Sequence, residues 1–531
     1  MDFLKISPPR FVAGIFFFLF FLFGRVFAED ALITASIAEP SNLLPLFASD
    51  SASAQVSGLI FNGLVKYDKD LKLVGDLAVS WEILEGGLVI IFHLRKDVLW
   101  QDGAPFDAAD VEFTFRQLTD PTVPTPYGGD FEKVKSLTVL DPHTVQVTYR
   151  EPFSPGLASW SMGMLPAHLL RGENLLKTSF SRKPVGTGPY RMAKWKTGEF
   201  LELTANEAYF EGPPGIRHFI LRVIPDPATS FLELETEALD LAALSPLQFE
   251  KETDSAFFKS HYRKYRLPSF GYAYVGYNLK NPLFSDVRVR RAIGLAIPKE
   301  EIIRTVLLGK GRVATGPFLP GTWAASDAVQ ASPYQPQESA RLLQEAGWHD
   351  QDGDGILEKN GQKFSFALLT NHGSDERKMA CEVIQQSLSK IGIRVEIRII
   401  EWRAFLKEFI DKRKFDAVLL AWQLSRDPDI FDLFHSSKTS PGQFNFVSYE
   451  NPEADRLLEE GRRFFDEAAR AKIYHRLHEI LSRDEPYTFL YVPETLLALH
   501  ARFEGAEPAA AGLTYNLIRW RSASGKEKYD V

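Results

Sequence analysis

The sequence predicts an α/β protein with a parallel sheet in its second half. Beyond residue 362, segments that alternate apolar and polar residues follow helices with a 3.6-residue apolar period, in the order β-α-β-α-β. No internal repeat, low-complexity tract or long Gly/Ser linker interrupts the chain. Any domains must therefore be joined by short connecting segments. This favours domains that meet at a hinge.

The chain begins with an apolar segment. Lys5 and Arg10 precede an apolar run over residues 11–24, and the small side chains Val26 and Ala28 follow it. The run is shorter than the roughly 20 residues that a membrane-spanning helix needs. We therefore expect residues 1–28 to be a signal peptide cleaved after Ala28. An uncleaved anchor is the alternative.

The charge balance is acidic. The formal net charge is −8, and the signal segment itself carries three basic side chains and one acidic one, so the mature chain is more negative still. Nucleic acids and anionic membrane surfaces attract basic proteins. Neither is expected as a partner.

The chain has a single cysteine, Cys381. It can form no internal disulfide and no Cys-rich metal site. Its place in an apolar helical stripe predicts a small buried hydrophobe. No cysteine stands at the signal cleavage position for lipid attachment, so we expect a protein retained in the periplasm of a cell with two membranes. The length of the mature chain favours three or four domains.

The first half mixes strands and helices. Residues 88–94 are β-rich, and residues 137–140 and 145–149 form the two strands of a predicted hairpin. Asp107 is a candidate N-cap, with Asp110 three residues later, for a helix that ends near Leu118.

The second half is more regular. An apolar stripe over residues 289–297 predicts a helix, a second follows over 298–309, and a third over 337–346. The β-α-β-α-β stretch then starts. Its strands are expected at residues 364–368, 393–399 and 415–422, with helices near 374–391 and 402–410.

Open α/β sheets bind ligands at the carboxyl ends of their strands. Three such ends are predicted, at residues 371–373, at Glu401–Trp402 and from Trp422 to Asp427. The last offers an aromatic wall, an arginine and carboxylates together. We expect the ligand there.

Motifs of catalysis are missing from the sequence. It contains no Gly-x-Ser-x-Gly, His-Glu-x-x-His, Walker or Gly-x-Gly-x-x-Gly signature, and the glycines of residues 185–189 predict a turn. We expect no enzymatic activity. A hydrolase that uses a carboxylate pair in the cleft is the alternative.

No metal or other cofactor is expected. Residues 350–355 copy the first half of a calcium-binding EF-hand loop, but position twelve is Gly361 where a bidentate glutamate is required. A structured acidic turn is therefore favoured over a calcium site. His475 and His478 lack further ligands and are expected on a solvated helix face.

Residues 270–278 concentrate aromatic side chains. With a period of two, Tyr272 and Tyr274 share one face of a strand, and Tyr277 lies beyond a break at Gly276. The strand is either an ordinary part of a core or a hinge strand whose tyrosines contact the ligand.

The ordered motifs resemble the periplasmic oligopeptide-, dipeptide- and nickel-binding receptors of ABC importers, the family 5 extracellular solute-binding proteins. The resemblance covers nearly the whole mature chain, and the matching segments are Glu39-Pro40-Ser41-Asn42-Leu43, residues 61–65, 77–82, 92–95, 102–103, 109–111, 184–190, 287–292 and 345–348.

The resemblance implies a two-lobed periplasmic-binding-protein fold of type II-like character, with an extra inserted domain and a hinge between the lobes. The implied lobe I is residues 29–65, 185–266 and 490–531, the inserted domain is 66–184, and lobe III is 267–489. Both lines of reasoning place the ligand beside Trp422. The expected ligand contacts are Glu39, Tyr272, Tyr274, Asn278, Trp402, Trp422, Ser425 and Asp427.

One departure from the family pattern concerns the ligand. Peptide receptors of this type carry an Asp three residues after the matching Trp, where it pairs with the peptide's amine; here that residue is Ser425. Either Asp427 takes over this role, or the ligand has no ordinary free amine.

The resemblance implies a monomeric receptor that captures a peptide or peptide-like solute and delivers it to an inner-membrane ABC permease. A nickel chelate or an oligosaccharide is the alternative ligand. A sensor or a chaperone-like module is the alternative role.

Overall fold

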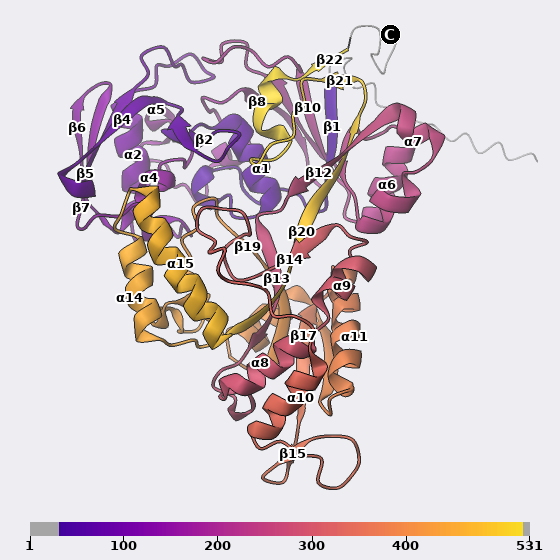
Figure 1. Ribbon diagram of the computed structural model, residues 1–531. Coiled ribbons are helices and arrows are strands. Elements are labelled where there is room, and N and C mark those ends of the chain that lie inside the picture. The colour runs from indigo at the N-terminus through magenta and orange to yellow at the C-terminus, as the bar shows by residue number, and fades with distance from the viewer. Residues whose placement is uncertain (1–30, 524–531) are drawn as a thin grey trace, which may run out of the picture.

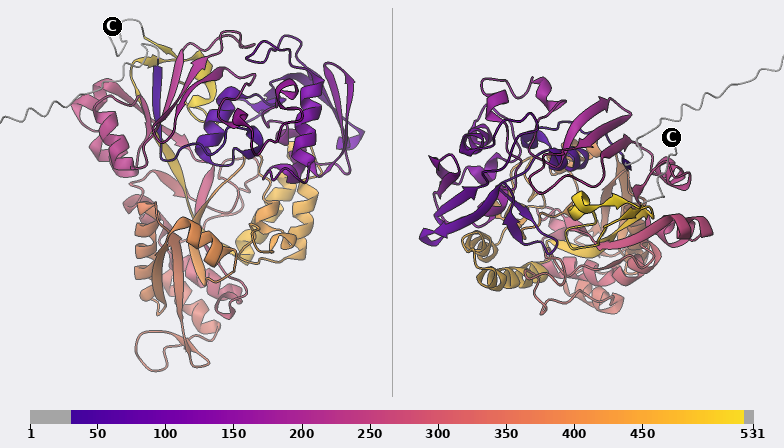
Figure 2. Two further views of the ribbon diagram at one scale, coloured as in Figure 1. Left: turned by 180° about the vertical axis from the view of Figure 1, so that it is seen from behind. Right: turned by 90° about the horizontal axis from the view of Figure 1, so that it is seen from above.

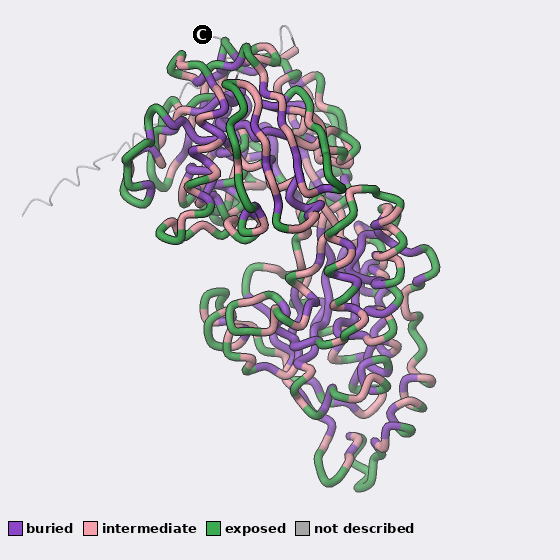
Figure 3. The backbone as a smooth tube through the Cα atoms, turned by 90° about the vertical axis from the view of Figure 1, so that its left-hand side faces the viewer, coloured by how far each residue is buried: buried purple, intermediate pink, exposed green. Residues whose placement is uncertain are grey.

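The computed structural model describes residues 31–523. Figure 1 shows an upper body that contains the N-terminal strands and a lower body built mainly from the second half of the chain. In Figure 3, buried residues run through the interior of both bodies, and the bodies join along one side. The predicted signal peptide lies outside the described residues. Within those residues, no helix combines the length and apolar character needed to cross a bilayer.

A twelve-stranded sheet runs through both bodies. Its main order is β18-β17-β19-β13-β20-β11-β1-β10-β9-β8, and β12 and β14 also pair with β20. The strands are β1 Ala31–Ser36, β8 Tyr190–Lys196, β9 Phe200–Ala205, β10 His218–Val223, β11 Leu241–Ala243, β12 Tyr262–Pro268, β13 Gly271–Tyr277, β14 Gly311–Val313, β17 Ser365–Asn371, β18 Arg394–Ile400, β19 Ala417–Gln423 and β20 Tyr487–His500.

The long strand β20 connects the bodies. Its first residues pair with β13 in the lower body, and its last residues pair with β12 and β11 in the upper body. Because β20 is 14 residues long, one strand can extend from the core of the lower body into that of the upper body. Leu490 packs in the core of the lower body and Leu499 in that of the upper body.

The upper body is built around β1, which pairs in parallel with β10. Buried Arg502 bonds the carboxylate of Asp240 at 2.8 and 3.1 Å and the carbonyl of Ala31 at 2.6 Å, which ties the chain's last third to its first strand. The helices of this body are α1 Ser51–Ile60, α6 Pro227–Glu235 and α7 Ala256–His261. Figure 2 shows α6 and α7 at the side opposite the separate four-stranded sheet.

The separate sheet has the order β4-β5-β7-β6 and is antiparallel. The predicted hairpin over residues 137–149 is confirmed as β6 and β7, and the predicted helix is confirmed as α2, with Asp107 and Asp110 forming a capping box. The elements are β4 Ala78–Leu84, β5 Val89–Leu94, β6 Val134–Asp141, β7 Thr144–Tyr149, α2 Ala108–Thr119, α3 Gly128–Phe131, α4 Pro155–Ser159 and α5 Ala167–Leu170.

The lower body contains the predicted β-α-β-α-β stretch, which is confirmed. Strand β17 pairs in parallel with both β18 and β19, so the carboxyl ends of all three lie at one edge. Cys381 is fully buried under this sheet, as predicted. The helices are α8 Val287–Ala296, α9 Lys299–Thr305, α10 Pro336–Glu345, α11 Asp375–Ser389, α12 Trp402–Ala404, α13 Phe431–Phe434, α14 Pro452–Gly461 and α15 Glu467–Asp484.

Three local predictions differ from the structure. The helix expected over 298–309 ends at Thr305, and the helix expected over 402–410 is one α turn followed by a π-helical turn over Phe405–Ile410. The prediction of a solvated face for His478 is wrong. Its side chain is fully buried where α15 packs against Phe318, and burial lowers its pKa to about 4.

Candidate functional site

The loop that follows β19, residues 424–430, is folded by its own polar groups, and we call it the β19 loop. The hydroxyl of Ser425 donates to the carbonyl of Asp427 at 2.5 Å, and the carboxylate of Asp427 accepts from the backbone N–H of Asp429 at 3.0 Å. Asp429 in turn accepts from the N–H of Phe431, where α13 begins, at 3.1 Å. These short-range bonds are typical of Asp-rich turns.

A cavity of about 610 Å³ lies between the β19 loop and the upper body, and we call it the interlobe cavity. The upper body contributes Phe61, Tyr67 and Ser159 to its wall. Its charged lining consists of Asp130, Arg426, Asp427, Asp429, Asp432 and Arg462. The volume is within the range of small-molecule binding sites.

A second cavity, of about 410 Å³, shares four residues with the interlobe cavity, all from the β19 loop. We call it the apolar cavity because most of its other walls are apolar. These walls include Phe270, Phe318, Leu319, Trp323, Leu424 and Ile430. Such a lining favours an apolar side chain of a ligand over a charged group.

Two arginines hold the carboxylates of the β19 loop. Arg470 of α15 donates two hydrogen bonds to Asp427, at 2.7 and 2.8 Å, and Arg462, which follows α14, lies 2.9 Å from Asp429. Burial raises the pKa of Asp429 to about 6, and the positive charge of Arg462 only partly opposes this shift. Both aspartates of the loop are therefore committed to partners within the protein.

The upper and lower bodies also touch each other around the interlobe cavity. The carbonyl of Arg462 accepts a hydrogen bond from the N–H of Ser154 at 2.7 Å, and its guanidinium stacks on Phe153 and Phe431 at 5.1 and 4.1 Å. Arg426 lies over the ring of Tyr67 at 5.2 Å. These contacts join the two bodies beside the interlobe cavity.

Comparison with known proteins agrees with this geometry. Residues 72–444 match the family model described as bacterial extracellular solute-binding proteins, family 5 Middle. The chain belongs to this family. The family resemblance and the two-lobed fold predicted from the ordered motifs are therefore confirmed.

Several relatives of this family 5 protein carry names that mention ligands. The oligopeptide-binding protein AppA of Bacillus subtilis is 34% identical over 92% of this chain and 91% of its own. Heme-binding protein A of Haemophilus influenzae is 27% identical over 87% of this chain and 86% of its own.

Two solved structures have the same fold. AppA from Bacillus subtilis in complex with a nonapeptide matches with a TM-score of 0.80 and 33% identity, covering 93% of this chain and 99% of its own. NikZ from Campylobacter jejuni in complex with Ni(L-His) matches with a TM-score of 0.83 and 30% identity, covering 93% of this chain and 100% of its own.

Of the predicted site residues of this family 5 chain, Ser425 and Asp427 line both cavities. Trp422 is half-buried just before the loop; its ring is parallel to that of Tyr274 at 6.1 Å, and its Nε1 donates to the hydroxyl of Tyr487 at 3.4 Å. Trp402 is half-exposed at the end of β18 and lines neither cavity.

The predicted hinge tyrosines do share one face of β13, as their spacing indicates. Tyr272 and Tyr274 are both fully buried in the core under Trp422 and line neither cavity. Within the described residues, the hydroxyl of Tyr272 has no hydrogen-bond partner. Asn278, at the end of the same strand, donates to the carbonyls of Arg413 and Phe415 and so fixes the backbone beneath the sheet.

Glu39 lies in the upper body, where its carboxylate is already bonded. It accepts hydrogen bonds from Trp195 Nε1 at 2.5 Å and from the N–H of Gly198 at 3.1 Å, and Arg182 lies 3.5 Å away. The structure therefore brings Ser425 and Asp427 to the interlobe cavity with Trp422 beside them. It holds Glu39, Tyr272, Tyr274, Asn278 and Trp402 elsewhere.

Sequence reasoning did not identify Asp130, Arg462 or Arg470 as part of this site. Arg470 had a usable signal, because it shares the buried stripe of α15 with Tyr474, Leu477 and Leu481 at helical spacing. An arginine in an apolar stripe indicates a buried charge pair. Asp130 lies in the four-residue helix α3, which is too short to show a period, and Arg462 caps the end of α14, outside its apolar stripe.

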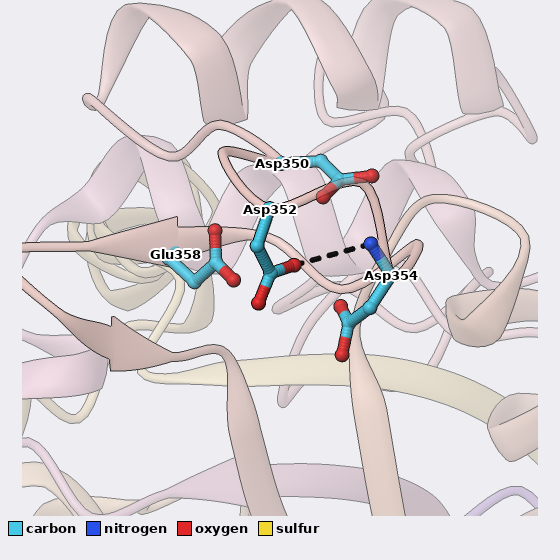
Figure 4. A group of neighbouring side chains, drawn as sticks. All are labelled: Asp350, Asp352, Asp354 and Glu358. Carbon is cyan, nitrogen blue, oxygen red and sulfur yellow. Dashed lines mark hydrogen bonds between the residues drawn. The ribbon is translucent and has the colours of Figure 1, made fainter.

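The acidic turn forms a separate cluster at the tip of the lower body, near β15 Glu358–Lys359 and β16 Gln362–Lys363 (Figure 1). Figure 4 shows the carboxylates of Asp350, Asp352, Asp354 and Glu358 converging, with one oxygen of each within 4.8 Å of the others. The ammonium of Lys363 lies 3.0 Å from Asp352 and also contacts Asp354. A lysine of the chain itself thus supplies positive charge to this cluster.

Proposed function

We propose that this protein is the periplasmic receptor of an ABC importer, which captures a peptide or peptide-like solute in the interlobe cavity and delivers it to an inner-membrane permease. The observation that carries the proposal is the β19 loop, which lines two cavities and faces the upper body across one of them. The relationship to AppA, with 34% identity over nearly the full length, supports a peptide as ligand.

The two cavities match the needs of a peptide. The interlobe cavity has a charged and polar lining, which suits backbone groups and termini, and the apolar cavity suits a hydrophobic side chain. Trp422 and Ser425 are expected to set the shape of the site where the two meet. We expect Asp427 to act on the loop's conformation, because its carboxylate is held by Arg470.

A nickel chelate is the second candidate, favoured by the 30% identity to NikZ. In that complex the metal is carried by histidine itself. The peptide is our first choice, because the relative named for oligopeptides is 34% identical and because the two cavities suit a polar backbone and an apolar side chain.

We propose that the protein has no catalytic activity. A hydrolase of the carboxylate-pair type needs one carboxylic acid and one free carboxylate on either side of the scissile bond. Asp427 and Asp429 are instead held by Arg470 and Arg462. Their ion pairs support a role in shaping the loop.

The proposed division of the chain follows from the same reasoning. Lobe I comprises residues 29–65, 185–266 and 490–531, an inserted domain comprises 66–184, and lobe III comprises 267–489, with β20 crossing the hinge. We propose a monomer that is exported by cleavage after Ala28. Size-exclusion chromatography with light scattering, and N-terminal sequencing of the exported protein, test these two points.

Mass spectrometry under native conditions tests the ligand class directly. Protein purified from a periplasmic extract is sprayed intact, and the released ligand is identified. The unfolded and refolded protein is then titrated calorimetrically with a peptide mixture, with nickel-histidine and with oligosaccharides. We expect saturable binding of peptides alone. Binding of nickel-histidine or oligosaccharide without peptide would replace the proposed ligand, and binding of none would contradict the receptor function.

A genetic experiment separates transport from a sensor or chaperone role. Deletion of the gene is expected to abolish growth on the identified ligand as sole nitrogen source, as deletion of the partner permease does. Normal uptake in the deletion strain would contradict the transport role.

A further inference from the structure

A peptide with a free N-terminus brings an ammonium group into the site. An ammonium buried without a counter-charge costs several kcal/mol, so the site must supply a carboxylate. The β19 loop has Ser425 three residues after Trp422, and its two aspartates are both held by arginines. No carboxylate of the loop is therefore left for a ligand.

Two more carboxylates line the interlobe cavity, and one of them is also committed. Asp432 of α13 is paired with Lys438 at 2.9 Å. Asp130 of α3 differs, because it forms no ion pair with residues 31–523. No lysine, arginine or histidine nitrogen of these residues lies within 4.0 Å of its carboxylate oxygens. Its Oδ2 accepts a hydrogen bond from the hydroxyl of Ser159 at 2.6 Å, and its Oδ1 has no bond to the described residues.

Asp130 is held rigidly on the wall of the upper body, opposite the β19 loop. The neighbouring Phe131 is buried edge-on against Trp160 at 5.1 Å, which anchors the short helix α3. Ser159, the hydrogen-bond donor, belongs to the adjacent helix α4. The carboxylate is thus preorganised at the cavity wall, and little entropy is lost when a ligand group binds it.

The electrostatic surroundings of Asp130 favour a cation. Burial raises the pKa of its carboxyl group, the positive charge of Arg462 opposes this, and the negative charges of Asp432 and Asp427 add to it. An incoming ammonium would relieve both the desolvation and the repulsion.

A positively charged side chain of the cavity, Arg426, is also available to a ligand. Arg426 makes no ion pair with the described residues; its guanidinium rests on Tyr67 and reaches the carbonyl of Ala511 only at 3.5 Å. The interlobe cavity thus presents one available carboxylate from the upper body and one available guanidinium from the lower body. This arrangement matches a ligand that carries both an ammonium and a carboxylate.

We propose that Asp130 receives the ligand's N-terminal ammonium group. The amine anchor would then lie on the upper body, in α3, and would replace the carboxylate that is missing at Ser425. The proposal rests on the proposed peptide-receptor function and adds to it a requirement for a free N-terminus.

The test compares peptides with and without the amine. A synthetic mixture of tri- to nonapeptides is offered to refolded protein, and the most enriched peptide lacking lysine is made in free-amine and N-acetylated forms. Calorimetry of the wild type is expected to show at least about tenfold tighter binding of the free-amine form, the scale of one charged hydrogen bond. A lysine-containing, N-acetylated peptide tests whether a side-chain amine can substitute.

The decisive variants are Asp130→Asn and Asp130→Ser, which guard each other against a folding defect, with Asp130→Glu to retain the charge. Glu132→Gln is the matched control, because Glu132 is an exposed acidic residue nearby that lines neither cavity. Both neutral variants should lose at least about tenfold in affinity for the free-amine peptide and little for the acetylated form. D130E and E132Q should keep the preference. Equal binding of the two peptides by the wild type, or an unchanged preference in D130N or D130S, would overturn the proposal while leaving the receptor function intact. Failure of the wild type to enrich any peptide would overturn both.

Discussion

Arg470 donates two hydrogen bonds to Asp427, at 2.7 and 2.8 Å, across 43 residues of sequence. The same guanidinium bonds the carbonyl of Gly461 at 3.1 Å and the hydroxyl of Tyr474 at 3.0 Å. One side chain therefore joins α14, α15 and the β19 loop. The position of the loop at the cavity depends on a helix that itself lines little of it.

Replacing Arg470 with Met should destabilise the protein strongly, because it leaves the Asp427 carboxylate without its partner. Breaking a buried pair in this way costs about 3 kcal/mol or more, and urea unfolding measures it. D427N should restore part of the loss in the double variant. The control is Arg476→Ala on the same helix, whose exposed pair with Glu453 contributes little to stability because water screens it. Equal losses in R470M and R476A would contradict the role assigned to Arg470.

Glu485 predicts a pH-dependent stability. Burial raises its pKa to about 7, although Lys299, Thr488 and Arg290 favour the charged form. Because the folded-state pKa lies above the unfolded value, the folded protein takes up the proton first as pH falls. The contribution of Glu485 to the free energy of unfolding should therefore decrease as pH rises from about 4.5 to about 7.

The variant Glu485→Gln isolates this contribution. It should be more stable than the wild type at pH 8 by up to about 3 kcal/mol, and the two should converge near pH 4, below the unfolded-state pKa. Urea unfolding of both proteins across this range gives the difference between their free energies of unfolding. The contributions of the other titrating groups are nearly equal in the two proteins and cancel. A difference that does not change with pH would show that Glu485 is not the titrating group.

Gly186 should tolerate no side chain. A Cβ at this position would lie 1.8 Å from the carbonyl oxygen of Ile60, which also accepts the hydrogen bond of Gly188 at 2.7 Å. Gly186→Ala should lower the free energy of unfolding by about 2–3 kcal/mol, since backbone cannot yield as a side chain does. Gly58→Ala, in the neighbouring helix α1 with no atom within 4 Å, should be neutral or slightly stabilising. Similar melting temperatures for the two variants would refute the steric argument.

Lys363 should govern how the acidic turn responds to divalent cations. Without its ammonium, the carboxylates of Asp352, Asp354 and Glu358 repel one another. We expect Lys363→Met to melt at a lower temperature than the wild type in EDTA and to gain more than the wild type from millimolar calcium. Scanning calorimetry with and without calcium measures both. An equal calcium response in the two proteins would count against this role of Lys363.

Much of the lower body could be predicted because its signals are local. The alternation around Phe366 and the stripe around Ile384 each identify an element without reference to the rest of the chain. The β19 loop could be found for the same reason, because it follows a parallel strand. Interruptions of regular helices were less predictable, as the π-helical turn after Trp402 shows.

The site itself depends on contacts between distant segments, which local patterns do not encode. A period of two correctly puts Tyr272 and Tyr274 on one face, but only the flanking strands β19 and β20 determine that this face is buried. Likewise, the presence of Asp427 in the loop is visible in the sequence. Its capture by Arg470, and the exposure of Asp130 to the same cavity, arise only in the folded molecule.

The participation of β20 in both bodies has a consequence for the order of folding. Both cores need its residues 487–500, which pair with strands β13 and β12 far away in the sequence. Long-range pairings of this kind form slowly, whereas β6 and β7 of the four-stranded sheet are neighbours in the sequence. The central sheet is therefore expected to be completed late in folding, after the local hairpin has formed.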